Sequence, residues 1–260
     1  MLSVSQETGK SRSAEHVVQL YGSDEPGLFA NGGRFLSEGL ARGDALIVIA
    51  TAQHCEAFAR AMKDHGAALE QGLRDGRVLF LNAPVTLDGM MLNGQPDRQK
   101  FEGVMLPAVD HVLKPAGRTS ITAYGEMVGL LWTRGEQAAA IQLEQYWNEL
   151  LARVPMNLFC AYPIDLFRTG HLSGLDPVLC SHTHLIPVNQ GLESAIGRAM
   201  EEVLGDRAAT LKLHIKTNLR PEWAAMPTGE AILLWLRTNP DASADEILDR
   251  ARRYYQAAAA

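Results

Sequence analysis

The stretch TSITAYGEMVGLLWTRGEQAAAIQLEQYWNELL, residues 119–151, decides the fold that we expect for this chain. Residues 119–124 have the β-branched and apolar character of a buried strand, which ends at Gly125 and Glu126. Beyond Gly135, apolar residues recur every three or four positions, which predicts an amphipathic helix. A glycine and a carboxylate directly after a buried strand are typical of the ligand-binding edge of an open α/β sheet.

Four further apolar runs have the length of strands, and segments with helical spacing separate them. The second run is almost continuously apolar, as expected for a strand that helices cover on both faces. Alternation of strands and helices predicts an α/β fold with a three-layer, mostly parallel sheet. The five runs lie at residues 16–21, 45–51, 78–82, 119–124 and 157–162.

The pattern changes after about Asp165, beyond which only helical spacing is found. We therefore expect a flexible tail at residues 1–13, an α/β domain at residues 14–187 and an all-helical C-terminal region at residues 188–260. The C-terminal region holds nine Lys or Arg and ten Asp or Glu residues, so it lacks the clustered positive charge of nucleic-acid readers. Its composition favours a role in packing or in homodimerisation.

The bulk composition of the 260-residue chain is that of a globular protein. No apolar run approaches the roughly 20 residues that a membrane-spanning helix needs. The net charge of −6 argues against a broad nucleic-acid-binding face. The three cysteines include no CxxC pair, and the first 15 residues lack the apolar core of a signal peptide, so we expect a cytoplasmic protein.

The first predicted turn, YGSDEPG at residues 21–27, lies where a nucleotide-binding α/β domain has its phosphate loop. A phosphate loop needs glycines that expose backbone N–H groups and a lysine that reaches the terminal phosphates. This turn has no lysine, and Asp24 and Glu25 would repel a triphosphate. The sequence therefore argues against ATP hydrolysis, and we expect no cofactor.

Polar residues near the carboxyl ends of the predicted strands are candidates for ligand binding. His54 is either a pocket donor or metal ligand, or a polar residue at a helix N-terminus. Glu126 either binds a ligand in the cleft or caps the next helix. Cys160 is either a nucleophile, which would need a neighbouring base, or a small apolar residue of a buried strand. Trp132 belongs either to the core or to a ligand cage.

The segment CSHTH, residues 180–184, has the alternation of a metal box. On a strand, Cys180, His182 and His184 would point to the same face. No fourth ligand follows nearby in the sequence, so the pattern favours an interpretation without metal, and we predict no metal site.

Five segments of the chain carry one set of motifs: HVVQLYGSDE, GLARGDALIVIATAQH, GQPDRQKFEGVMLP, YGEMVGLLWTRGEQAAAIQLEQYWNELL and LFCAYPIDLF. Together these segments resemble the MEDS domain, which is the methanogen/methylotroph and dichloromethane-regulator sensory domain of prokaryotic signalling proteins. The resemblance covers about residues 14–187. It implies a RecA/KaiC-like α/β fold that has lost its phosphate loop, and a role in sensing small hydrocarbon derivatives.

The resemblance also implies that some of the residues at the motif positions line a ligand pocket, without assigning a role to each. We expect a sensory or regulatory protein, not an enzyme, that binds a small organic ligand at the carboxyl edge of the sheet. It would signal to a partner protein such as a kinase or regulator, since the chain has no recognisable kinase or helix-turn-helix module of its own. The predicted ligand-binding residues are His16, Asp24, Glu25, His54, Glu126, Trp132, Cys160 and Tyr162.

Two other functions fit the same residues. One is an enzyme that uses Cys160 or a metal held by His54 and Glu126. The other is a pseudo-ATPase scaffold that binds nucleotide without hydrolysing it, or that binds only proteins.

Overall fold

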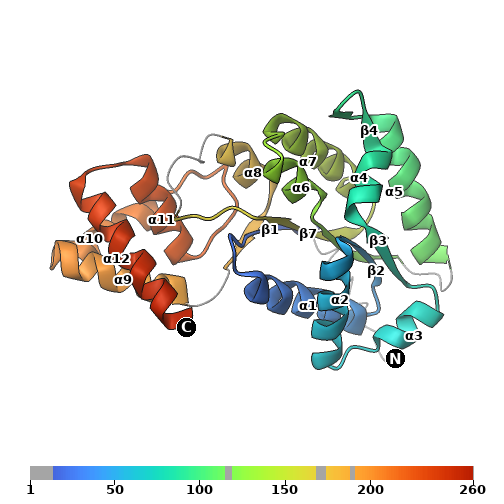
Figure 1. Ribbon diagram of the computed structural model, residues 1–260, viewed down its shortest axis with the longest axis horizontal. Coiled ribbons are helices and arrows are strands. Elements are labelled where there is room, and N and C mark those ends of the chain that lie inside the picture. Colours follow the sequence, from blue (N-terminus) through green and yellow to red (C-terminus); the bar gives the residue numbers. More distant parts are fainter. Residues whose placement is uncertain (1–13, 115–118, 168–173, 188–190, 260) are drawn as a thin grey trace, which may run out of the picture.

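The computed structural model describes residues 14–114, 119–167, 174–187 and 191–259. Its centre is a six-stranded sheet with the strand order β3-β2-β6-β7-β1-β8 (Figure 1). Every neighbouring pair is parallel, which confirms the predicted parallel α/β sheet. The strands are β1 (His16–Leu20), β2 (Ala45–Ala50), β3 (Val78–Asn82), β6 (Ile121–Gly125), β7 (Met156–Tyr162) and β8 (His184–Ile186).

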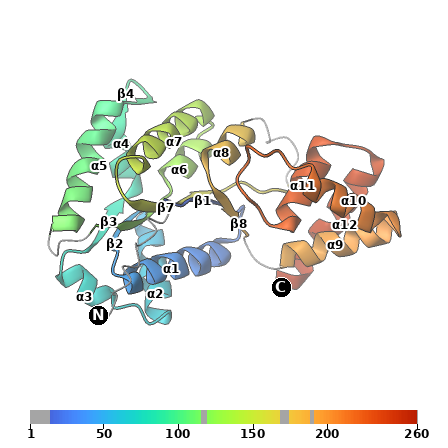
Figure 2. The same cartoon turned by 180° about the vertical axis from the view of Figure 1, so that it is seen from behind.

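Helices cover both faces of the sheet, so the domain has the three layers expected from the sequence (Figures 1 and 2). A short antiparallel hairpin of β4 (Met91–Leu92) and β5 (Gln95–Pro96) joins two of the helices. The helices on one face are α1 (Glu25–Arg42), α2 (Ala52–Asp64) and α3 (Leu69–Arg74), and those on the other are α4 (Ala83–Met90), α5 (Arg98–Leu113), α6 (Met127–Thr133) and α7 (Gln137–Leu151).

The strand side chains alternate between two hydrophobic cores, because successive residues of a strand point to opposite faces. In β2, Leu46, Val48 and Ala50 lie in the core with α1 and α2. Ile47 and Ile49 lie in the core with α4 to α7. All five are fully buried, which explains why this run is continuously apolar.

Gly32 and Gly33 lie within α1, and they allow α2 to pack closely against it. A Cβ at Gly32 would lie 2.5 Å from Cε1 of Phe58, and a Cβ at Gly33 would lie 2.6 Å from the Cβ of Ala61. The pair is therefore a packing feature of two helices.

Four C-terminal helices form a group at one end of the sheet (Figure 1). Their apolar residues continue the core of the α4 to α7 face, and α12 packs along α9. Among the described residues, no helix combines the length and the hydropathy that crossing a bilayer requires. The helices, which we call the C-terminal helices, are α9 (Gly191–Leu204), α10 (Arg207–Thr217), α11 (Thr228–Thr238) and α12 (Ala242–Ala259).

The prediction that only helices follow Asp165 is wrong. After α8 (Leu175–Ser181), β8 adds a parallel strand to β1, with Val18 opposite Leu185. Ala225, between α10 and α11, lies on the outer side of β8 and accepts the N–H of Leu185 at 2.7 Å. A strand of three residues is too short to show an alternating pattern. The predicted flexible tail, residues 1–13, and the predicted boundary at residue 188 lie outside the described residues.

Candidate functional site

The predicted ligand-binding residues fall into groups on opposite faces of the sheet. In β7, Phe159 lies in the core with α1 and α2, whereas Cys160 and Tyr162 lie in the core with α6 and α7. His54 and Glu126 meet on the α2 side, so the structure does not bring Tyr162 to them.

Glu126 is 5% exposed and joins several elements at the carboxyl edge of the sheet. Its Oε1 accepts the Thr51 N–H at 2.5 Å, and its Oε2 lies 2.6 Å from Nδ1 of His54. The Tyr124 hydroxyl donates to Oε2 at 3.1 Å. On the far side of the imidazole, Glu25 of α1 lies 3.7 Å from Nε2. The side chain of Glu126 does not cap α6, although Glu126 directly precedes that helix. Its carboxylate instead links the end of β6 to the start of α2 through the hydrogen bond from the Thr51 N–H.

The imidazole of His54 is held between two carboxylates. The hydrogen bond to Glu126 raises the pKa of His54 above its ordinary value of 6.5, against the opposing effect of burial, and Glu25 acts in the same direction as Glu126. Thr51 caps α2 by accepting the backbone N–H of His54 at 3.3 Å. His54 therefore does occupy a helix N-terminus, and its ring also joins a polar network.

Replacing His54 with glutamine is expected to destabilise the protein mainly at mildly acidic pH. Because the folded-state pKa of His54 is raised, its contribution is complete below the unfolded value of 6.5 and is lost as the pH rises through the folded value. We expect a loss of about 2 kcal/mol near pH 6, the magnitude of a hydrogen bond to a charged group. Urea unfolding between about pH 5.5 and about pH 9 measures this difference.

The exposed His65, at the end of the same helix, provides the control. His65→Gln should leave the stability unchanged across the same pH range. A His54→Gln difference that stays constant from acid to alkaline pH would contradict the pairing with Glu126.

The turn between β1 and α1 uses its own carboxylate at the start of the helix. Asp24 Oδ1 accepts the N–H of Gly27 at 3.0 Å and caps α1. Gly22 has a φ of 56° and packs against Asp165, where a Cβ would lie 3.3 Å from Cα. A phosphate at a helix N-terminus needs such N–H groups, so Asp24 competes with any phosphate for this position.

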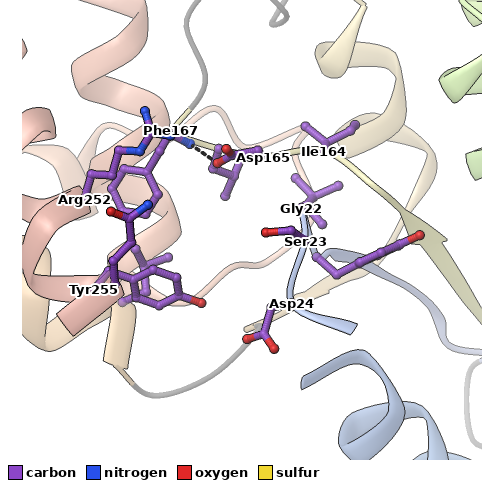
Figure 3. Close-up of a pocket in the computed structure, with 13 residues that line it drawn as sticks. Gly22, Ser23, Asp24, Ile164, Asp165, Phe167, Arg252 and Tyr255 are labelled. Atoms are coloured by element: carbon purple, nitrogen blue, oxygen red, sulfur yellow. Dashed lines mark hydrogen bonds between the residues drawn. The ribbon is translucent and has the colours of Figure 1, made fainter. Parts of the chain in front are cut away.

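A cavity of about 110 Å³, which we call the α12 cavity, lies between this turn and the C-terminal helices (Figure 3). Ser23 and Asp24 of the turn line one side, and Arg252 and Tyr255 of α12 line the other, where the ring of Phe167 packs against that of Tyr255 with centroids 5.6 Å apart. Leu192 of α9 also contributes to the wall. Of the eight predicted ligand-binding residues, Asp24 alone lines this cavity.

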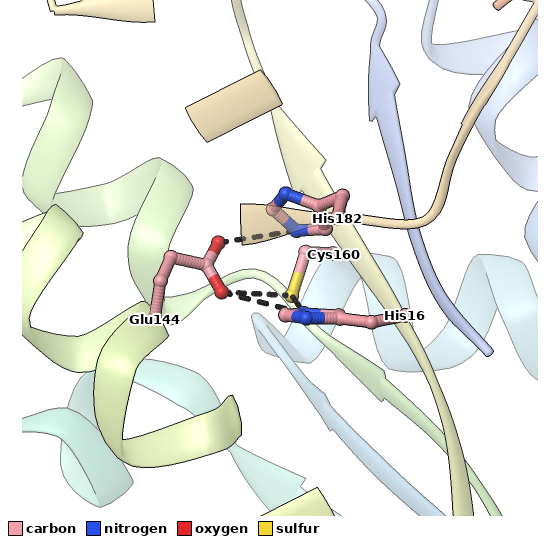
Figure 4. A group of neighbouring side chains, drawn as sticks. All are labelled: His16, Glu144, Cys160 and His182. Atoms are coloured by element: carbon pink, nitrogen blue, oxygen red, sulfur yellow. Dashed lines mark hydrogen bonds and ion pairs between the residues drawn. The ribbon is translucent and has the colours of Figure 1, made fainter. Parts of the chain in front are cut away.

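Four side chains that can bind metals meet on the α7 face of the sheet, and we call them the four-residue cluster (Figure 4). One donor atom from each lies within 4.8 Å of the others, and all four residues are buried. His16 and Cys160 were predicted to bind a ligand, whereas Glu144 and His182 were not. The members are His16 of β1, Glu144 of α7, Cys160 of β7 and His182, which follows α8.

The carboxylate of Glu144 is the centre of this cluster. Its Oε2 lies 3.4 Å from Nε2 of His16 and 3.7 Å from Sγ of Cys160. Its Oε1 lies 3.4 Å from Nε2 of His182 and accepts the Tyr162 hydroxyl at 2.6 Å. The ring nitrogen Nε2 of His16 is also 3.3 Å from the Cys160 sulfur.

The burial of the cluster sets the protonation of its members. Burial raises the pKa of Cys160, and the neighbouring Glu144 adds to this effect, so the thiol stays protonated at neutral pH. Burial lowers the pKa of His182, which keeps its ring neutral. Burial opposes ionisation of Glu144, but the adjacent imidazoles and the hydrogen bond from Tyr162 outweigh it and lower its pKa. A protonated thiol is a poor nucleophile unless a neighbouring base takes its proton, and Nε2 of His16 lies 3.3 Å from the sulfur.

The CSHTH segment does not form a box of its own. α8 ends at Ser181, and Cys180 and His184 are exposed, so only His182 reaches the cluster. Trp132 is 8% exposed and packs edge-on against Tyr162, with ring centroids 5.5 Å apart. Trp132 therefore belongs to the core beside the cluster.

Sequence comparison places this architecture in a family. The model of the MEDS family, described as the MEthanogen/methylotroph, DcmR Sensory domain, matches residues 15–183. The chain belongs to the MEDS family. The matched MEDS region contains the four-residue cluster and the Glu126 network, whereas the C-terminal helices lie beyond it. No curated protein matches the chain. Membership of this sensory-domain family indicates a sensory or regulatory role.

Proposed function

We propose that the protein senses a small organic molecule that binds in the α12 cavity, and that it signals binding to a partner protein without catalysing a reaction. This proposal rests on one observation: two different parts of the chain line the cavity. Asp24 and Phe167 belong to the MEDS region, whereas Arg252 and Tyr255 belong to the C-terminal helices. A ligand that contacts both parts can favour one packing of the helices over another.

The dimensions and chemistry of the cavity support a ligand of a few heavy atoms. Its volume of about 110 Å³ is below the roughly 150 Å³ of an engineered protein cavity that holds benzene. Leu20, Ile164 and Leu192 provide apolar walls, and Asp24 and Arg252 provide charged groups. This lining suits a small hydrocarbon derivative that carries one polar group, in accordance with what the family resemblance implies.

The C-terminal helices are suited to transmit such a change because α12 is linked to α9 by polar contacts. Arg250 of α12 donates to Oε2 of Glu202 in α9 at 3.0 Å, and the Tyr254 hydroxyl donates to the same oxygen. A shift of α12 on ligand binding would therefore move α9 with it. The surface of the C-terminal helices would present the signal to a kinase or regulator.

Binding in the α12 cavity is expected to raise the melting temperature. The test is a thermal-shift screen of the full chain with C1–C4 alcohols, aldehydes, amines and carboxylates. A ligand at 100 times its Kd should stabilise the folded state by about 2.7 kcal/mol. Arg252→Ala, which changes the cavity wall, should abolish or weaken the response.

Arg253 is the matched control, because it is the next residue of α12, is exposed and does not line the cavity. Arg253→Ala should respond to the ligand as the wild type does. The proposal loses its support if no compound raises the melting temperature, or if both variants respond equally well.

A further inference from the structure

We propose that His16, Glu144, Cys160 and His182 together bind one transition-metal ion of the Zn²⁺ class (Figure 4). The site would lie between β1, β7, α7 and the segment that follows α8. It is separate from the α12 cavity, whose lining includes none of the four residues, so it stands or falls independently of the ligand proposed above.

The hydrogen bond of His182 fixes its tautomer. Nδ1 lies 2.6 Å from the carbonyl oxygen of Val178, which can only accept, so Nδ1 carries the proton. In the neutral ring, Nε2 then has a lone pair. This nitrogen is buried and has no hydrogen-bond partner, although it lies 3.4 Å from Oε1 of Glu144. An imidazole lone pair that faces a carboxylate in a buried site is stabilised by a cation between them.

A second set of hydrogen bonds orients His16 in the same way. Its Nδ1 lies 2.9 Å from Oδ1 of Asn148. The amide of Asn148 cannot be reversed, because its Nδ2 donates to the carbonyl oxygen of Ser181 at 3.2 Å. Nδ1 of His16 therefore donates, and in the neutral ring the lone pair of Nε2 points toward Cys160 and Glu144. Outer hydrogen bonds of this kind fix the ring orientation of metal-binding histidines.

The separations among three of the donor atoms match those of a tetrahedral metal site. Zn–N and Zn–O bonds of ~2.0–2.1 Å and a Zn–S bond of ~2.3 Å place tetrahedral ligand atoms ~3.3–3.7 Å apart. Nε2 of His16 lies 3.3 Å from the Cys160 sulfur and 3.4 Å from Oε2 of Glu144. The sulfur lies 3.7 Å from the same carboxylate oxygen. These three donor atoms are thus spaced for one ion, and Nε2 of His182, which lies within 4.8 Å of the others, would have to move closer to complete the site.

The donor set selects the class of metal. Two imidazoles and a thiolate suit zinc and the later first-row metals, whereas calcium and magnesium prefer oxygen ligands. Four protein ligands in a fully buried position are typical of a structural zinc site, which keeps no position open for substrate. Binding would replace the proton of the Cys160 thiol, which would leave to solvent as the sulfur–metal bond forms. Such an ion would link His182, two residues before the start of β8, to His16 of β1 and Cys160 of β7.

Metal content and a cobalt spectrum test the proposal on the 260-residue chain. Protein purified from zinc-supplemented medium should retain about one zinc ion per chain. After zinc removal and addition of Co²⁺, a thiolate-to-cobalt charge-transfer band should appear in the near ultraviolet. Protein that retains no zinc, and that binds neither Zn²⁺ nor Co²⁺ after treatment with chelator, would overturn the proposal.

The three cysteines allow the sulfur ligand to be assigned by substitutions that change little in side-chain size. A Cys55→Ser, Cys180→Ser double variant keeps Cys160 as the only thiol and should retain the cobalt band in full. Cys160→Ser should lose it. Loss of the band in the double variant, or its persistence in Cys160→Ser, would show that the sulfur of Cys160 is not the ligand.

Histidine variants provide a matched pair for the nitrogen ligands. His182→Gln should abolish retention of zinc, whereas His184→Gln, two residues away and exposed, should leave it unchanged. Asn148→Ala, which removes the orienting partner of His16, should weaken zinc binding about 10- to 100-fold. Equal zinc affinity in the wild type and in His182→Gln would count against the site.

Discussion

Replacing Glu126 with alanine is expected to lower the free energy of unfolding by about 3–5 kcal/mol, the cost of removing one partner from a buried charged pair. The change leaves the Thr51 N–H, the His54 ring and the Tyr124 hydroxyl without their common acceptor. Each buried polar group that loses its partner costs about 1–3 kcal/mol. Urea unfolding at neutral pH measures the effect through a lower midpoint at an unchanged slope.

Two further variants distinguish the effect of losing these hydrogen bonds from the general effect of removing a carboxylate. Glu126→Gln keeps an acceptor for the Thr51 N–H and should cost less than the alanine variant. Glu136→Ala removes an exposed carboxylate that makes no side-chain hydrogen bond to cap α7, and it should leave the stability nearly unchanged. A cost below about 1 kcal/mol for Glu126→Ala would mean that water replaces the missing acceptor.

Replacing Gly39 with alanine is expected to lower the free energy of unfolding by about 3 kcal/mol, at the upper end of the usual cost of overpacking. Gly39 is the point where α1 touches β6. An added Cβ would lie 2.6 Å from the Cβ of Thr122, and Thr122 cannot swing away because its hydroxyl donates to Asp44 at 2.8 Å. The helix must therefore move off the sheet. Thermal and urea unfolding would both report the loss.

Gly103 in α5 provides a control with the opposite sign. It is exposed, and a Cβ there would meet nothing within 4 Å. Gly103→Ala should therefore stabilise the protein by about 0.5–1 kcal/mol, because alanine has the higher helix propensity. Equal effects at Gly39 and Gly103 would show that helix propensity, not contact with Thr122, controls both positions.

Much of the fold could be predicted from local sequence patterns. The run at residues 119–124 corresponds to β6 at Ile121–Gly125, and the amphipathic helix predicted beyond Gly135 corresponds to α7 at Gln137–Leu151. These elements follow from the spacing of neighbouring apolar residues. The strand β8 was missed because its three residues carry no periodicity.

The candidate sites were harder to predict, because they depend on which side chains share a face. Glu126 and Cys160 both lie near the carboxyl ends of strands, yet they belong to networks on opposite faces. The partners of Cys160 come from a helix and from the segment after α8, which only tertiary packing brings together. One signal was present in the sequence: Glu144 is a carboxylate between Leu143 and Trp147 on the apolar face of a helix.

The pairing of Ala225 with β8 also bears on how the molecule avoids self-association. A strand at the edge of a sheet presents unpaired N–H and C=O groups that can template pairing with another chain. Here the N–H of Leu185 donates to the carbonyl oxygen of Ala225, and the N–H of Ala225 donates to the carbonyl oxygen of Thr183 at 2.9 Å. The segment before α11 thus covers the edge that β8 would otherwise offer to a neighbouring molecule. A chain cut at the end of the matched family region would lose both the last strand and this cover, and would leave β1 as an open template for aggregation.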